Sequence, residues 1–328
     1  MYTMKIKATS TLFAITATIC IAMALSSAST CQESAKGLGD RNEQSIAVSP
    51  DIPRSITFAG EEISLTTQDR RERMDREMLA FSYSHINTML QIKRANRLFP
   101  IVEPILKECE VPDDLKYLMI IESNGDKEAL SPAKAGGLWQ FLESTGKEYG
   151  LEVNKEVDER YHIEKATRAA CAYLKESYEI YKDWLTVAAS YNTGRGNIAK
   201  RIEGQKTDKA IEMKLLPETS RYIFRLLAAK AIFTSPQKYG FRLRSCDLYP
   251  YIPHKETIEI DTTVANWGIL AKEKGITYLQ LREANPWIRG TSLTNKNRKI
   301  YIVNIPDPKA LEYDPQKTKA HDSRWVIE

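Results

Sequence analysis

The chain has 328 residues, of which 42% are hydrophobic and 27% are charged, the composition of a globular protein with one sizeable core and room for a smaller module. This composition argues against a largely disordered chain and against a bundle of membrane helices. The formal net charge is only +4 and no dense block of Lys or Arg occurs, which argues against nucleic acid as a partner.

Residues 1–30 have the layout of a secretory signal peptide. Lys5 and Lys7 precede an uncharged apolar run from Leu12 to Leu25, and small residues follow. A permanent membrane anchor is the alternative, but the run is short for the roughly 20 residues of a membrane span and it contains Thr and Ser. We therefore expect an exported protein.

Cysteines add little to this expectation. Cys31 follows the small residues at about the place of a lipidated cysteine, and a lipid there would attach the protein to a membrane. Ala28 stands where a hydrophobe is expected, so lipidation stays open. The cysteines after residue 31 are widely spaced and lie in no CxxC motif or histidine pair, so we expect no metal site.

Residues 31–69 are polar and are expected to form a tether with little core of its own. From residue 70 the pattern becomes helical, with one rough apolar stripe that Pro100 is expected to end. The residues of that stripe are Met74, Met78, Phe81, His85 and Leu90.

Further helical patterns follow, while alternating strand patterns are scarce. We therefore expect a mostly α-helical main domain over residues 70–245. Its later helices are expected at residues 99–110, 112–123, 163–181, 183–192 and 218–233.

Beyond this domain the pattern changes to a small β-α-α-β unit, expected over residues 255–306. Two short strand patterns, "ETIEIDTTV" and "RKIYIVNIP", enclose two short helical patterns that stop at Gly275 and at Asn285. Residues 307–328 are polar and rich in proline, so we expect a loosely ordered tail.

Glu122 interrupts the apolar face of the helix expected at residues 112–123. It continues at i+7 the stripe of Leu115, Leu118 and Met119, so its carboxyl group follows the face that should be buried. Apolar surroundings and the negative end of the helix dipole both raise the pKa of a carboxyl group. A raised pKa suits a general acid at neutral pH. The alternative is an exposed carboxylate on a terminal turn.

Two glycine-containing motifs follow this helix. "AGGLWQF" has two adjacent glycines, which let backbone approach closely, before Trp139 and Gln140, an aromatic and an amide that can line a groove. "SYNTGRG" places Tyr191 and Asn192 before a glycine turn. Each motif alone is a weak signal, since Trp139 could lie in the core and the second motif could be a turn.

Together, "IES", "GLWQF" and "SYNTG" resemble the lytic transglycosylases of the lysozyme-like superfamily, and residues 95–240 are similar to the membrane-bound murein transglycosylase D branch. The resemblance implies a lysozyme-like catalytic domain that acts on peptidoglycan in the periplasm or at the outer membrane, without a cofactor. Lys134 departs from the pattern, which has a small residue there.

The resemblance also implies site residues. A single glutamate after the apolar helix is the catalytic acid/base of that family, and it maps onto Glu122. Positions that orient the acid or hold the sugar map onto Ser123, Gln140, Tyr191 and Asn192, and a groove tyrosine maps less securely onto Tyr222.

A glycosidase normally needs two carboxylates. Asp126, Glu128 and Glu143 are candidates for the second, but none matches a catalytic position of the family. The resemblance implies that one glutamate suffices. Glu122 would protonate the glycosidic oxygen between MurNAc and GlcNAc and then deprotonate the C6 hydroxyl of MurNAc, which leaves a 1,6-anhydroMurNAc end.

The C-terminal unit, with "WGILAKEKGITYLQLREANPWIRG", is similar to a LysM module, a peptidoglycan-binding fold, although its opening "IDTTV" departs from the usual Gly-Asp-Thr. Glycan binding and a spacer role therefore both stay open. Two other functions also stay open for the whole chain: a lysozyme-type hydrolase and a non-catalytic peptidoglycan-binding protein.

Overall fold

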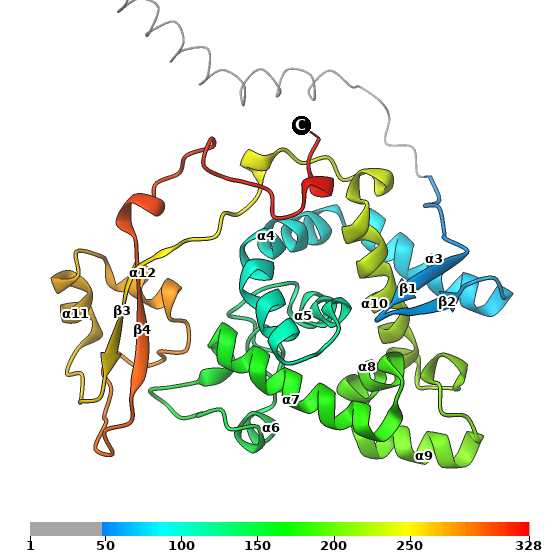
Figure 1. Cartoon of the computed structure of the whole chain (residues 1–328), viewed down its shortest axis with the longest axis horizontal. Helices are drawn as coiled ribbons and strands as arrows, with labels where there is room; N and C mark the ends of the chain where they lie inside the picture. The colour runs from blue at the N-terminus through cyan, green and yellow to red at the C-terminus, as the bar shows by residue number, and fades with distance from the viewer. Residues whose placement is uncertain (1–47, 328) are drawn as a thin grey trace, which may run out of the picture. The chain divides into compact units, whose positions relative to one another are not determined.

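The computed structural model describes residues 48–327. The expected signal peptide, Cys31 and the first part of the expected tether lie outside the described residues. The described residues are mostly helical, as predicted, with two separate two-stranded antiparallel sheets (Figure 1). None of the helices in this part of the chain is both long and apolar enough to cross a membrane.

The expectation of a tether without a core is wrong for residues 55–64, which form a β-hairpin beside α10 (Figure 1). Strand β1 (Ser55–Phe58) pairs with β2 (Glu61–Ser64) through a turn in which Ala59 and Gly60 both have positive φ. Such a turn matches the twist of a hairpin. Three buried side chains anchor the hairpin and its end on the main core: Phe58, Ile63 and Leu65.

The expectation that Pro100 ends the first helix is also wrong. The chain breaks instead at Ser84, between α3 (Gln68–Tyr83) and α4 (His85–Glu108), and Pro100 lies inside α4. A proline inside a helix costs roughly 3 kcal/mol. Each buried apolar side chain contributes about 1.5 to 3 kcal/mol, which offsets that cost. The buried apolar side chains around it are Leu98, Phe99, Val102, Ile105 and Leu106.

Four of the five later helices of the main domain lie where they were predicted, to within a few residues, while the one expected at residues 99–110 is the second half of α4. The four are α5 (Lys116–Ser123), preceded by the 3-10 turn η1 (Asp113–Leu115), and α7 (Ile163–Tyr181), α8 (Trp184–Thr193) and α10 (Pro217–Thr234). Helix α10 packs against α3, α5 and α8. The pattern did not predict α6 (Glu143–Glu148), α9 (Arg195–Gln205) or the 3-10 turns η2 (Glu159–Tyr161) and η3 (Ala210–Glu212).

The C-terminal unit has the predicted β-α-α-β order. Strand β3 (His254–Ile260) pairs antiparallel with β4 (Tyr301–Pro306), and α11 (Trp267–Glu273) and α12 (Tyr278–Ala284) lie between them in the chain. The unit has a buried cluster of its own, which includes Trp267, Leu281 and Val303.

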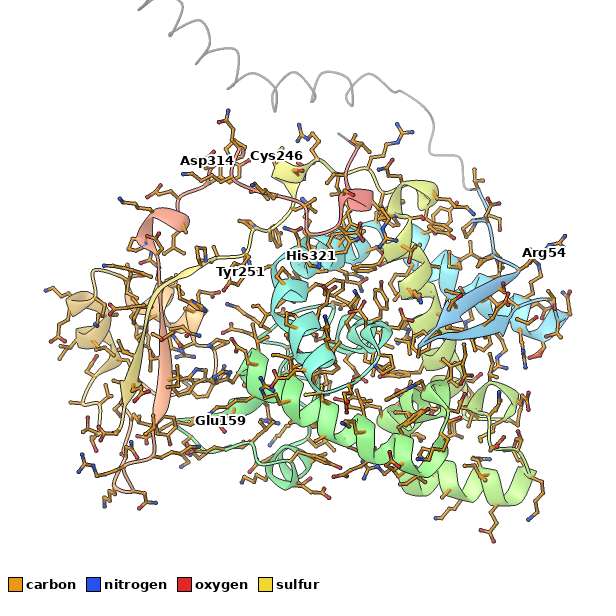
Figure 2. All side chains as sticks on the ribbon, viewed as in Figure 1. Arg54, Glu159, Cys246, Tyr251, Asp314 and His321 are labelled. Carbon is orange, nitrogen blue, oxygen red and sulfur yellow. The ribbon has the colours of Figure 1, made fainter. Side chains whose placement is uncertain are left out.

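A loop of the main domain completes this second cluster. Val157 is buried within it and pairs with Ile288 in an isolated β-bridge. Lys299 Nζ lies 2.5 Å from Glu152 Oε2 and 3.4 Å from Glu159 Oε1, and Figure 2 shows Glu159 on the side of the main domain toward β4. The C-terminal unit is therefore docked on the main domain rather than tethered to it.

The polar tail, expected to be loosely ordered, returns to the main core. Trp325 is 2% exposed and its Nε1 donates a hydrogen bond of 2.8 Å to the Phe233 carbonyl. His321, labelled in Figure 2 near α4, lies 2.9 Å from Glu103. The composition of the tail predicted that it has no long helix or strand, but it did not predict that Trp325 is buried in the main core.

Candidate active site

Glu122 lies in the last turn of α5, on the stripe that its spacing predicted. The other members of the stripe are fully buried: Leu115, Leu118 and Met119. Glu122 itself is partly exposed. The helix ends at Ser123, because Asn124 and Gly125 adopt positive φ of 55° and 64°. The carboxyl group therefore sits at the negative end of the helix dipole.

Burial raises the pKa of Glu122 to about 7. Three groups on α10 adjust that pKa: the hydrogen bond from Tyr222 and the charge of Arg225 lower it, and the charge of Glu218 raises it. A carboxyl group with a pKa near 7 is partly protonated at neutral pH. It can therefore donate a proton and later accept one.

Tyr222 is the direct partner of this carboxyl group. Its hydroxyl donates a hydrogen bond of 2.5 Å to Glu122 Oε1. Burial raises the pKa of Tyr222 well above its ordinary value, so the phenol stays a donor at any working pH. The tyrosine that the resemblance mapped least securely thus contacts the candidate acid.

The adjacent glycines Gly136 and Gly137 allow the loop after α5 to pack closely against Arg160. Gly137 has a φ of 76°, and a Cβ atom there would lie 1.9 Å from the Arg160 carbonyl oxygen, so a larger residue does not fit. The Arg160 guanidinium donates to the carbonyls of Lys134 and Phe141 at 2.8 and 3.1 Å and pairs with Asp158 at 2.7 Å. The predicted close backbone approach is confirmed.

Trp139 and Gln140 support this loop from within. Trp139 is fully buried and its Nε1 donates to Thr167 Oγ1 at 3.0 Å, so of the two possibilities left open for it, the core is confirmed. The Gln140 amide donates to the carbonyls of Ala129 and Gly137 at 3.2 and 2.8 Å. These bonds fix the loop beside the site, and a sugar contact of Gln140 stays a prediction.

Two further motif residues have local roles. The buried Ser123 hydroxyl donates to the Met119 carbonyl at 2.7 Å, which stabilises the last turn of α5. Lys134 has a φ of 63°, a conformation that costs a side-chain-bearing residue roughly 1 to 2 kcal/mol. A glycine would avoid that cost, because it has no Cβ atom.

Tyr191 and Asn192 lie in the last turn of α8, before Gly194. The Tyr191 hydroxyl donates to the Trp139 carbonyl at 2.6 Å, which ties α8 to the glycine loop. Burial raises the pKa of Tyr191 well above its ordinary value, and the charge of Glu122 adds to the effect. Asn192 is partly exposed next to Tyr191.

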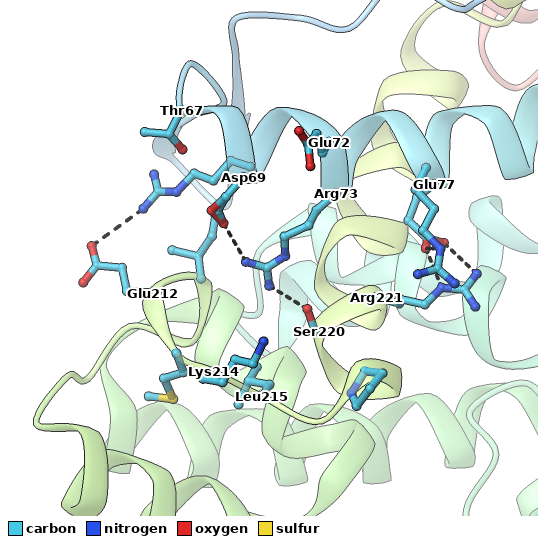
Figure 3. Close-up of a pocket in the computed structure, with 15 residues that line it drawn as sticks. Thr67, Asp69, Glu72, Arg73, Glu77, Glu212, Lys214, Leu215, Ser220 and Arg221 are labelled. Atoms are coloured by element: carbon cyan, nitrogen blue, oxygen red, sulfur yellow. Dashed lines mark hydrogen bonds and ion pairs between the residues drawn. The ribbon is translucent and has the colours of Figure 1, made fainter.

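A buried ion network next to Tyr222 was not predicted. Glu77 of α3 is 1% exposed and accepts from Arg221 Nε at 2.7 Å and from Arg225 Nε at 3.4 Å (Figure 3 shows Glu77 beside Arg221). Because Arg225 also lowers the pKa of Glu122, Glu77 fixes a charge that acts on the candidate acid. The signal in the sequence is the i, i+4 pair of arginines that brackets Tyr222.

The candidates for a second catalytic carboxylate are Asp126, Glu128 and Glu143. Asp126 and Glu143 form ion pairs with basic side chains at 3.6 and 2.7 Å, and Glu128 is exposed. The carboxylate whose charge acts on Glu122 is Glu218 instead. In the described part of the chain, no three His, Cys, Asp or Glu side chains are grouped to hold a metal ion.

Two family descriptions match the sequence. Residues 101–214 match the Transglycosylase SLT domain, and residues 256–309 match the soluble lytic transglycosylase C-terminal LysM-like domain. The first match contains Glu122 and both glycine motifs, and Tyr222 lies just beyond its end. The second match covers the β-α-α-β unit.

Similar whole proteins carry related names. Membrane-bound lytic murein transglycosylase D of Escherichia coli K12 is 30% identical over 244 residues, which are 72% of this chain and 52% of that protein. The protein of the same name from Escherichia coli O6:H1 strain CFT073 gives the same values. A putative tributyltin chloride resistance protein of Alteromonas sp. strain M-1 is 27% identical over 123 residues, which are 36% of this chain and 59% of that protein. The chain thus spans about half the length of the transglycosylase D relatives.

Proposed function

The chain contains a transglycosylase SLT domain and a LysM-like domain and is homologous to membrane-bound lytic murein transglycosylase D, and on this basis we propose that it is a peptidoglycan lytic transglycosylase. In this proposal it cleaves the β-1,4 bond between MurNAc and GlcNAc and leaves a 1,6-anhydroMurNAc end. The observation that carries the proposal is Glu122 itself, a carboxyl group with a pKa of about 7 that Tyr222 holds by one short hydrogen bond.

In the first step Glu122 is the general acid. Because Tyr222 engages Oε1, we assign proton delivery to Oε2, which protonates the glycosidic oxygen. Positive charge then develops on the MurNAc ring as the GlcNAc leaves. The acetamido group of the substrate stabilises this charge, so no second carboxylate is needed.

In the second step Glu122 is the general base. Its carboxylate accepts the proton of the MurNAc C6 hydroxyl while the C6 oxygen attacks C1. The anhydro ring closes, no water is consumed, and Glu122 regains its proton. The Tyr222 hydroxyl stabilises the carboxylate between the two steps, since a hydrogen bond to a charged acceptor is stronger than one to a neutral acceptor.

The remaining site residues position the reactants in this proposal. Tyr191 and Asn192 hold the sugar at the end of α8, and Gln140 and Ser123 keep the glycine loop and the last turn of α5 in place. Such positioning is needed because the reacting atoms must lie within about 3 to 3.5 Å of each other.

The proposal extends to partner and location. Peptidoglycan is the substrate, and the LysM-like unit is a second contact with the glycan. The protein is exported and works in the cell envelope, in the periplasm or at the outer membrane. A lipid on Cys31 would add a membrane attachment.

Muropeptides released from purified sacculi test the proposal. Mass spectrometry is expected to find ends that are lighter by one water than those of a hydrolase. Products with ordinary reducing ends would identify a lysozyme-type hydrolase instead. Binding to sacculi without any released product would identify a non-catalytic binding protein.

A further inference from the structure

A cavity lies between α3 and the segment that leads into α10 (Figure 3). Its volume is about 870 Å³, within the range of sites that hold small ligands. We name it the arginine cleft after the basic side chains that line it: Arg70, Arg73, Arg76, Arg221 and Lys214.

Three of these cations already have carboxylate partners on the cleft walls. The pairs are Arg73 with Asp69 at 3.2 Å, Arg70 with Glu212 at 3.8 Å and Arg221 with Glu77 at 2.7 Å (Figure 3). Because the two charges of each pair neutralise each other, these pairs shape the cleft but add little net attraction for a charged ligand.

One carboxylate, Glu72, and two cations are left, and the two cations lie on opposite walls. Arg76, on α3, is 62% exposed and lies 3.9 Å from Glu77, a carboxylate that Arg221 already engages. Lys214, on the other wall, forms no ion pair or side-chain hydrogen bond within residues 48–327, while Gln205 fixes its backbone with bonds of 2.7 and 3.0 Å. The lining therefore has five cations against four carboxylates, an excess of one positive charge that attracts an anionic group.

Arg221 and Leu215 link the cleft to the candidate active site. Arg221 directly precedes Tyr222 on α10. Leu215 lines both the cleft and a smaller cavity of about 220 Å³, which also includes Thr193, the residue after Asn192. A glycan held at the end of α8 can therefore place a side branch across Leu215 and into the cleft.

We propose that the arginine cleft binds the carboxylates of the peptide that branches from MurNAc, through Arg76 and Lys214. The inference rests on the proposed function, because the MurNAc at the cleaved bond carries that branch. The peptide offers free carboxylates, which guanidinium groups bind in bidentate geometry and ammonium groups bind as point charges.

The test compares two soluble substrates: glycan oligomers that carry peptides and the same oligomers stripped of them by an amidase. The variant is the double substitution Arg76→Gln with Lys214→Gln. The matched control is Arg71→Gln with Lys209→Gln, two exposed cations on the same segments that do not line the cleft. Each is assayed at low and at high salt.

We expect kcat/KM of the double variant to fall about tenfold or more on the peptide-bearing oligomers. The variant loses two partly solvated ion pairs with the peptide, and each contributes up to about fivefold. Its kcat/KM on stripped oligomers should stay within about twofold of wild type, a difference too small to reflect a lost ion pair. High salt should reduce the wild-type preference for peptide, since salt screens exposed charges. Equal losses on both substrates, or no loss on either, would overturn the inference.

Failure of the proposed function would look different. Wild-type protein would then cleave neither substrate, or would leave ordinary reducing ends on both, whatever the peptide content. Calorimetric binding of the two oligomers by the wild type and the double variant would still decide the inference. A wild-type preference for the peptide-bearing oligomer that the double variant lacks supports the cleft, and equal binding of both oligomers contradicts it.

Discussion

Tyr222 of α10 donates a hydrogen bond of 2.5 Å to Glu122 of α5, a residue 100 positions earlier in the chain. Tyr222→Phe removes this donor and little else. A hydrogen bond to a charged group is worth about 1.5 to 3 kcal/mol, so we expect kcat to fall about 10- to 100-fold. Steady-state kinetics with thermal unfolding checks this. A wild-type kcat would show that the bond does not act on the reaction.

The pH dependence of kcat/KM follows from the charges around Glu122. The acid must be protonated to start the reaction, so kcat/KM should fall as pH rises through about 7. Arg225→Gln removes a charge that lowers the pKa of Glu122, so this fall should move to higher pH. Glu218→Gln removes a charge that raises the pKa, so the fall should move to lower pH.

Arg225→Lys is the control for that pair of variants, because it keeps the positive charge and should leave the profile close to that of wild type. Shifts of the same sign in Arg225→Gln and Glu218→Gln would contradict the assignment of Glu122 as the titrating acid.

Tyr191 and Asn192 give a test of sugar positioning. Tyr191→Phe loses the bond to the Trp139 carbonyl, and Asn192→Ala loses the partly exposed amide at the end of α8. We expect both to lower kcat more than they raise KM, because lost orientation is felt most in the transition state. If activity falls only in proportion to the melting temperature, these residues are turn and core formers.

Removal of residues from 254 onward should destabilise the main domain. It exposes Val157, whose burial is worth about 1.5 to 3 kcal/mol, and deletes Trp325, whose loss from a core costs about 3 to 5 kcal/mol. Trp325→Ala separates the two contributions. Calorimetry of both forms checks this, and an unchanged melting temperature of the truncated form would show that the C-terminal unit is an independent module.

Local patterns were enough to predict most helices and the β-α-α-β unit. Leu115, Leu118, Met119 and Glu122 share one face at helical spacing, and no tertiary contact is needed to see it. The contact between Tyr222 and Glu122 could not be predicted in this way, because their separation in sequence says nothing about their distance in space. Only the resemblance pointed to Tyr222.

The predictions that were wrong share one physical cause. Pro100 inside α4, the hairpin at residues 55–64 and the buried Trp325 each depend on packing between segments far apart in sequence. Propensity describes what a segment prefers alone, and burial in a shared core overrides it. Glu77 was missed for the same reason, because its arginine partners lie on another helix.

The most direct test of the account is the rate at which Glu122→Gln forms 1,6-anhydro ends from sacculi, measured beside its unfolding. Glutamine keeps the shape of the side chain but cannot donate or recover the proton. General acid/base catalysis is worth about 10² to 10⁴ in rate, so the account predicts at least that loss in a protein that is no less stable than wild type at neutral pH. Formation of anhydro ends at the wild-type rate by folded Glu122→Gln would contradict it.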